Sequence, residues 1–437
     1  MHKISTFSPI FFFLSVFFLS CNPRNSQIES DQAVSVSAYC LSNPEHSYEL
    51  YIPSGSRKCK KLPFLIILDP HGKGKSALEL FIPAAEKYKF ILAASNLIKN
   101  NLPDFVPRIQ ELREDITNKY PVNDQLVIAG FSGGARMAMN YAQFHQVEGV
   151  ITCGALASPE QISAIGSTVY AISGMADFNF IESAQYLFRP DNAPENLRIE
   201  FTRDLHQWPD SIQLSRLVGY IFFENSFETQ KCLDFKSLMN HFLKDEEKKS
   251  RDLLESGDYI SAYLEINNLA YVDIFHNSPE FIKLYNSSNY ANKLNEQLNM
   301  LKESIRFELQ IRETYYKQLA VKDSIWWKHE INTLNDQIKK SKSPYSALAY
   351  QRIKAFLGIM CYSLTDNALQ HHDLPTASRL LPVYAYLEPH NPDMFYFRAL
   401  YSKTTGNNVN EIKYYLQKAI DAGFSDQEKI EALREGF

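Results

Sequence analysis

One stretch, QLVIAGFSGGARMAMNYAQFH at residues 125–145, decides the fold of this chain. Its first five residues are mostly apolar and predict a buried strand, whereas residues 135–145 have the spacing of a helix. Between them stands the G-x-S-x-G sequence Gly130-Phe131-Ser132-Gly133-Gly134. A strand joined to a helix by so short a turn strains the serine backbone and needs neighbours without bulk. We therefore expect Ser132 at the tip of a sharp strand-to-helix turn.

Short apolar runs alternate with helical segments on both sides of this stretch. Residues 64–68 are continuously apolar, which is typical of a strand covered on both faces of a parallel sheet. More apolar and more polar residues alternate over residues 48–52, as they do in a half-buried strand. Repeated alternation of strands and helices predicts an α/β fold with a doubly wound, mostly parallel sheet. The other predicted strands are residues 90–94, 148–152, 168–172 and 198–202.

Two further polar residues follow predicted strands downstream of the serine. A serine hydroxyl needs a base to become a nucleophile, and the base needs a carboxylate to orient it. In a fold of this kind the chain order is nucleophile, acid and histidine. Asp177 follows the strand at residues 168–172, and His206 follows the strand at residues 198–202. The sequence thus predicts Ser132 as nucleophile, His206 as general base and then acid, and Asp177 as the orienting acid.

Each of these residues has an ordinary structural alternative. Ser132 would also suit a tight turn without chemistry, and Asp177 would also suit the N-cap of a helix beginning at Phe178. His206 would also suit a loop histidine packed by Trp208. Asp204 remains the alternative carboxylate, although it lies close to His206 in sequence.

Four segments resemble α/β-hydrolase esterases, with the dienelactone-hydrolase, feruloyl-esterase and polyhydroxybutyrate-depolymerase-like group as nearest kin. The resemblance covers about residues 45–225. It implies an α/β-hydrolase fold and carboxylic-ester hydrolysis through an acyl-enzyme on the Ser-His-Asp triad. It also implies an oxyanion hole formed by the N–H groups of Gly72 or Lys73 and of Gly133. The segments are LDPHG at 68–72, GFSGGAR at 130–136, GMAD at 174–177 and HQWP at 206–209.

The first residues of the chain differ from everything after them. Residues 1–20 have a short positive start and an almost wholly apolar run, which indicates a signal peptide. The run ends in Phe-Leu-Ser-Cys, which resembles a bacterial lipobox, although Phe18 stands where Leu is usual. We expect lipidation of Cys21, a flexible tether over residues 21–35, and attachment in the bacterial cell envelope, on the periplasmic side or the cell surface. A plain secretory signal and an uncleaved anchor are the alternatives.

Composition and cysteine spacing narrow the classes of function. The formal net charge is −5 and no dense basic stripe is present, so nucleic-acid binding is not expected. None of the six cysteines forms a C-x-x-C pair, and no cluster has metal-ligand spacing, so we expect neither a metal nor a cofactor. Cys40 and Cys59 flank the strand at residues 48–52, and export would let them pair. Two unpaired thiols are the alternative.

Beyond residue 226 the strand patterns stop. The sequence divides into a hydrolase domain at residues 36–226 and a helical domain at residues 227–437. Residues 376–422 predict paired helices with small residues at their crossings, and Pro389 follows one of them. This organisation resembles tetratricopeptide repeats, while an irregular helical bundle is the alternative.

The expected substrate follows from the short connection between two predicted strands. Only residues 153–167 join the strands at 148–152 and 168–172, which leaves little room for a lid. An open cleft suits an ester with a large polar leaving group, such as an acylated glycan, while peptide hydrolysis is an alternative. Another is a catalytically silent scaffold whose helical domain binds a protein partner. The membrane is expected to be contacted through the lipid alone.

Overall fold

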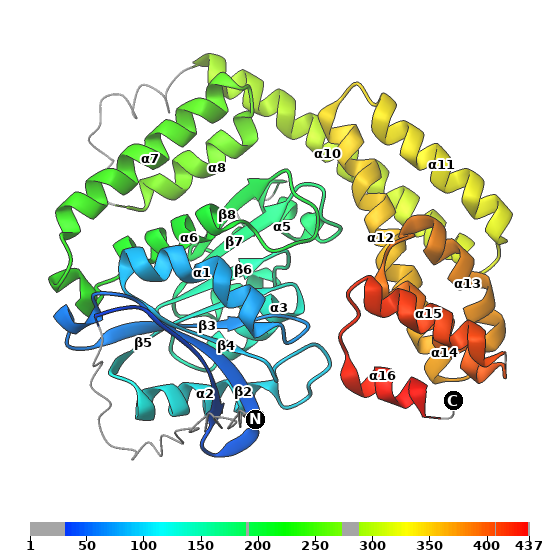
Figure 1. Ribbon diagram of the computed structural model, residues 1–437. Helices are drawn as coiled ribbons and strands as arrows, with labels where there is room; N and C mark the ends of the chain where they lie inside the picture. Colours follow the sequence, from blue (N-terminus) through cyan, green and yellow to red (C-terminus); the bar gives the residue numbers. More distant parts are fainter. Residues whose placement is uncertain (1–30, 189–191, 273–287, 407, 436–437) are drawn as a thin grey trace, which may run out of the picture.

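The computed structural model describes residues 31–188, 192–272, 288–406 and 408–435 (Figure 1). The predicted signal peptide, Cys21 and most of the predicted tether lie outside the described residues. The described chain forms one eight-stranded sheet flanked by helices, followed by an all-helical region.

The sheet has the strand order β1-β2-β4-β3-β5-β6-β7-β8. β2 runs antiparallel to both β1 and β4, and all other neighbours are parallel. The predicted doubly wound, mostly parallel sheet is therefore confirmed, and it has the α/β-hydrolase topology. β1 was not anticipated, and it begins inside the predicted tether. The strands are β1 Val34–Cys40, β2 Asn43–Ile52, β3 Leu62–Leu68, β4 Ile91–Ser95, β5 Val122–Phe131, β6 Gly149–Cys153, β7 Thr168–Gly174 and β8 Leu197–Thr202.

Helices cover both faces of the sheet, and the central strand β3 shows why its sequence is apolar throughout. All seven of its residues are buried. Phe64 and Ile66 point into the core on one face, while Leu65 and Ile67 point into the core on the other. The helices of this domain are α1 Gly74–Tyr88, α2 Phe105–Lys119, α3 Gly133–Ala142, α4 Pro159–Ser163, α5 Phe180–Phe188 and α6 Ser211–Glu224.

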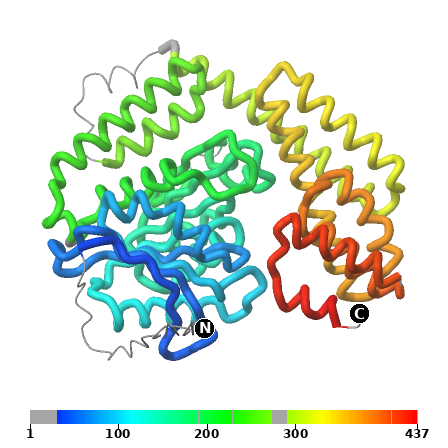
Figure 2. Tube along the Cα trace, in the orientation of Figure 1, coloured from blue at the N-terminus to red at the C-terminus, as the bar shows by residue number. Residues whose placement is uncertain are grey.

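The helical region forms an arc around the sheet domain (Figures 1 and 2). It starts with two helices packed over α6 and β8, and it ends with α14–α16 on the side where α3 lies. An all-helical second part is confirmed, whereas its membership of the tetratricopeptide class stays a prediction. No described helix combines the length and apolarity that crossing a membrane requires. The helices are α7 Phe235–Glu255, α8 Tyr259–Ala270, α10 Ser288–Leu319, α11 Ser324–Lys340, α12 Pro344–Gln370, α13 Leu374–Leu387, α14 Pro392–Thr404, α15 Val409–Asp421 and α16 Gln427–Arg434.

The disulfide of the described chain differs from the expected one. Cys59 pairs with Cys232, and Cys40 is a buried free thiol. The proposed Cys40–Cys59 pairing was wrong because Cys40 ends β1 and packs into the core, while the connection from β2 to β3 leads Cys59 toward the segment before α7. The bond joins residues 173 positions apart, so local spacing could not reveal it.

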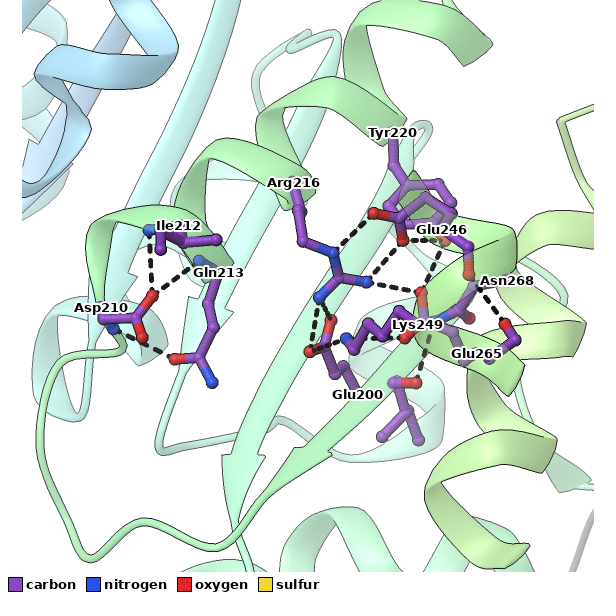
Figure 3. Close-up of polar contacts among 12 residues, drawn as sticks. Glu200, Asp210, Ile212, Gln213, Arg216, Tyr220, Glu246, Lys249, Glu265 and Asn268 are labelled. Carbon is purple, nitrogen blue, oxygen red and sulfur yellow. Dashed lines mark hydrogen bonds and ion pairs between the residues drawn. The ribbon is translucent and has the colours of Figure 1, made fainter. Parts of the chain in front are cut away.

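A cluster of buried charges fastens α7 and α8 to the sheet domain (Figure 3). The guanidinium of Arg216 on α6 donates hydrogen bonds to Glu200 on β8 at 2.9 Å, to Glu246 on α7 at 2.6 Å and to Glu265 on α8 at 2.5 Å. Lys249 also bonds Glu200, at 2.6 Å. Three carboxylates thus share two cations. Burial, reinforced by Glu265, raises the pKa of Glu246, while its bonds to Arg216 act in the opposite direction.

Candidate active site

Ser132 lies between the last residue of β5 and the first residue of α3. Its φ of 51° and ψ of −116° fall outside the common regions for an L-residue, which is the strained turn that the sequence predicted. Two glycines make this turn sterically possible. A Cβ at Gly130 would lie 2.3 Å from the backbone of Gly134, and a Cβ at Gly134 would lie 2.1 Å from the carbonyl oxygen of Leu68.

The three residues predicted as a triad meet at one edge of the sheet. The Ser132 Oγ lies 2.9 Å from Nε2 of His206, and Nδ1 of His206 lies 2.8 Å from Oδ2 of Asp177. They come from the ends of β5, β7 and β8, which are parallel strands whose carboxyl ends share an edge. When Nδ1–H donates to the carboxylate, Nε2 is left to accept the serine proton. The arrangement can therefore activate a hydroxyl as a nucleophile.

Asp177 is 1% exposed, and both of its oxygens are engaged. While Oδ2 faces His206, Oδ1 accepts the backbone N–H of Asn179 at 2.8 Å. This local bond lies before α5, which starts at Phe180 and not at Phe178, so Asp177 does not occupy the N-cap position of the helix. The alternative carboxylate, Asp204, contributes its backbone instead, because its carbonyl oxygen accepts the N–H of Ala176 at 3.2 Å.

Aromatic rings fix the plane of the imidazole. The rings of Phe131 and Phe178 lie with their centroids 4.7 Å and 4.3 Å from that of His206. Trp208 packs on Phe131 at 5.5 Å and donates its indole N–H to Oδ2 of Asp69 at 2.9 Å. The tryptophan of the His-x-Trp-Pro segment thus links the histidine loop to the loop after β3.

That loop holds the predicted second half of the oxyanion hole. Gly133 is the first residue of α3, so its N–H has no acceptor within the helix and can face an anion. In contrast, the N–H of Gly72 donates to the backbone oxygen of Asp69 at 3.1 Å, and the N–H of Lys73 donates to Oδ1 of Asp69 at 3.2 Å. Gly133 is the predicted donor that best fits the geometry, whereas Gly72 and Lys73 already have internal acceptors.

Asn100 is a neighbour of the nucleophile that no motif signalled. Its carboxamide lies so close to Gly133 that a Cβ there would sit 1.7 Å from Oδ1 of Asn100. The backbone N–H of Asn100 donates to Pro70 at 2.9 Å, which attaches it to the loop after β3. Its side chain thus comes from outside the predicted strands and borders the site.

The C-terminal helices approach the same loop. Asp393 stands in the first turn of α14, where burial raises the pKa of its carboxyl group and the charges of His71 and Lys73 oppose that rise. The start of α14 therefore lies within range of the charges on the loop after β3, on the side of the sheet domain where α3 is drawn (Figure 1). Across the described ranges, His, Cys, Asp and Glu side chains form no group of three that could hold a metal ion.

Comparison with known proteins yields matches among solved structures only. No protein-family model matches the sequence, and no curated protein matches it. One similar structure is an S-formylglutathione hydrolase of Staphylococcus aureus, with 11% identity and a TM-score of 0.37, covering 44% of this chain and 96% of its own. Another is an inhibited esterase B of Lactobacillus rhamnosis, with 13% identity and a TM-score of 0.35. That match covers 49% of this chain and 90% of the esterase. Similarity this low does not inform on activity.

Proposed function

We propose that this chain is an exported, lipid-anchored serine hydrolase that cleaves carboxylic esters through a Ser132 acyl-enzyme. One observation carries the proposal, namely the continuous hydrogen-bonded chain from Ser132 through His206 to Asp177. Export is supported by the pattern of residues 1–20 and by the Cys59–Cys232 bond, since disulfides persist in oxidising compartments. The lipid is proposed to sit on Cys21.

The mechanism follows from the two nitrogens of the histidine. Nε2 of His206 takes the proton of Ser132 as its Oγ attacks the ester carbonyl, and Asp177 stabilises the imidazolium that results. The N–H of Gly133, at the positive end of α3, is placed to stabilise the negative oxygen of the tetrahedral intermediate. His206 then protonates the leaving alcohol. Water, deprotonated by the same nitrogen, cleaves the Ser132 ester and restores the enzyme.

The substrate class is inferred from the surroundings of the serine. Only the five-residue α4 lies between β6 and β7, so this connection contributes no lid. The triad histidine keeps 20% of its side chain exposed. An ester with a bulky polar leaving group, such as an acylated glycan, would suit a site that the sheet domain leaves open.

Two reagents test the proposal. A fluorophosphonate probe is expected to label Ser132, and p-nitrophenyl acetate is expected to give a burst of product that Ser132→Ala abolishes. Ser163→Ala, at an exposed serine of α4, is the matched control and is expected to keep both signals. Equal bursts from wild type and Ser132→Ala would refute the assignment. Labelling followed by a panel of acetylated and feruloylated sugars would define the acyl and leaving groups.

A lack of labelling would favour the other class of function. If the probe fails and the full-length chain instead captures a defined protein, the hydrolase domain is a scaffold and the helical region is the binding part.

A further inference from the structure

We propose that two arginines of the helical region, Arg312 on α10 and Arg352 on α12, position the loop that carries Asp177. The helical region is then a working part of the active site and not a separate binding module. This inference rests on the proposed function, because positioning the acid matters only if Asp177 serves a triad.

Both arginines donate to the backbone on either side of the acid. Nη1 of Arg352 bonds the carbonyl oxygen of Met175 at 2.6 Å, and Nη2 of Arg312 bonds the carbonyl oxygen of Phe178 at 2.9 Å. Met175 and Phe178 bracket Asp177 within a four-residue segment of the loop between β7 and α5. Bonds at both ends of so short a segment fix the direction of the carboxylate between them. Phe178 also packs on the imidazole of His206, so the same contact bears on the base.

A single glutamate joins the two arginines. Oε2 of Glu308 pairs with Nε of Arg352 at 2.6 Å, and Oε1 pairs with Nη2 of Arg312 at 2.5 Å. Arg352 and Glu308 are fully buried, and Arg312 is 13% exposed. Breaking a buried ion pair strongly destabilises a fold, so the two helices hold their guanidinium groups in place. A cation–π contact also holds Arg352, because its guanidinium lies 5.0 Å from the centroid of the Phe180 ring.

The charges of Arg312, Arg352 and Glu308 are balanced only when Asp177 is included. Two guanidinium groups and one carboxylate leave a surplus positive charge in a buried position. Burial lowers the pKa of Arg312, while Glu308 and Asp177 act in the opposite direction, so the triad acid is among the negative charges that keep this guanidinium ionised. Counting Asp177, two positive charges face two negative ones. This neutrality explains how the helical region can place two arginines beside the acid loop.

The experiment uses the full-length chain and substitutes the less buried arginine. Arg312→Met removes the charge and the donors while keeping the length of the side chain. We expect kcat on p-nitrophenyl acetate to fall 10- to 100-fold with KM changed less than about 3-fold, because a small displacement of a catalytic group costs rate and not binding. Arg312→Lys keeps the charge and a donor and is expected to recover at least part of the loss. Arg306→Met, at an exposed arginine on the same helix, should behave as wild type.

Rates are counted per active site titrated with the fluorophosphonate probe, so that unfolded protein does not enter the comparison. Where Arg312→Met fails to fold, Arg312→Gln keeps donors without the charge and is expected to lose at least 5-fold in kcat. An Arg312 variant within 2-fold of wild type, or a lysine variant no better than methionine, would overturn the inference. An unlabelled wild type would count against the proposed function, whereas a labelled wild type with an unaffected Arg312→Met would count against this inference alone.

Discussion

Replacing Asp177 by asparagine is expected to disable the triad without changing its shape. Oδ1 of Asp177 accepts the N–H of Asn179 at 2.8 Å, and this bond requires an acceptor. The amide oxygen of an asparagine would therefore stay on that side, and its NH₂ group would face His206. Nδ1 of His206 would have to become the acceptor. The ring proton would move to Nε2 and point at Ser132, where it blocks proton transfer.

The size of the effect follows from the loss of the right tautomer. The same substitution in a serine-protease triad lowers kcat by about 10⁴-fold, which corresponds to roughly 5.5 kcal/mol of transition-state stabilisation. The bond from Asp177 to His206 is short, at 2.8 Å, and the carboxylate is 1% exposed, so water cannot substitute for it. We therefore expect a loss on the order of 10⁴-fold in kcat, with KM little changed.

Steady-state hydrolysis of p-nitrophenyl acetate and the rate of fluorophosphonate labelling measure this loss. Asp204→Asn is the matched control, because Asp204 supports the acid loop through its backbone carbonyl, and it should stay within about 3-fold of wild type. Thermal unfolding of both variants shows whether the fold is kept. The reasoning is wrong if Asp177→Asn retains more than a tenth of kcat, or if Asp204→Asn is the more damaging change.

Three predictions concern the stability of the fold. Gly134→Ala should cost more than about 3 kcal/mol in thermal unfolding, because its Cβ would meet the Leu68 carbonyl, whereas Gly166→Ala, where a Cβ meets no atom within 4 Å, should be nearly neutral. Cys232→Ser should lose about 2–5 kcal/mol in denaturant unfolding and make stability insensitive to reductant. Burial and Glu265 raise the pKa of Glu246 in the folded chain, so the stability that its bound proton contributes is complete below its ordinary pKa of 4.5 and falls as the pH rises through the raised pKa. Between pH 6 and 8 the wild type should therefore lose stability that Glu246→Gln does not lose, and parallel melts with equal slopes would contradict this.

The sheet and the triad were accessible from sequence because each depends on local patterns. Buried parallel strands are continuous apolar runs, as in β3, and the nucleophile turn needs glycines at fixed positions beside the serine. The carboxyl ends of parallel strands share an edge, so placing Asp177 and His206 after strands was enough to predict that they meet. The edge strand β1 was not predicted because its residues are mostly exposed and contain no apolar run.

Features that depend on distant pairing were not accessible. The partner of Cys59 lies 173 positions away, at a place set by the packing of the segment before α7 on the sheet domain. Asn100 and the acid-loop arginines belong to no motif, and only the folded chain brings them near the site. In the loop after β3, the sequence identified the residues but not their hydrogen bonds. The acceptor that Asp69 offers to Lys73 could not be inferred.

The helical region contacts the sheet domain through two separate buried groups of charges. Near its start, Arg216 and three glutamates bond α7 and α8 to β8, the strand that leads into the His206 loop. Farther along, Arg352 and Arg312 bond the backbone around Asp177, the residue that orients His206. The second group bonds the loop that holds Asp177 directly, whereas the first bonds the strand that precedes the His206 loop. Within the described residues, the turn of Ser132 is built by β5 and α3, while the loop of Asp177 is bonded by both parts of the chain.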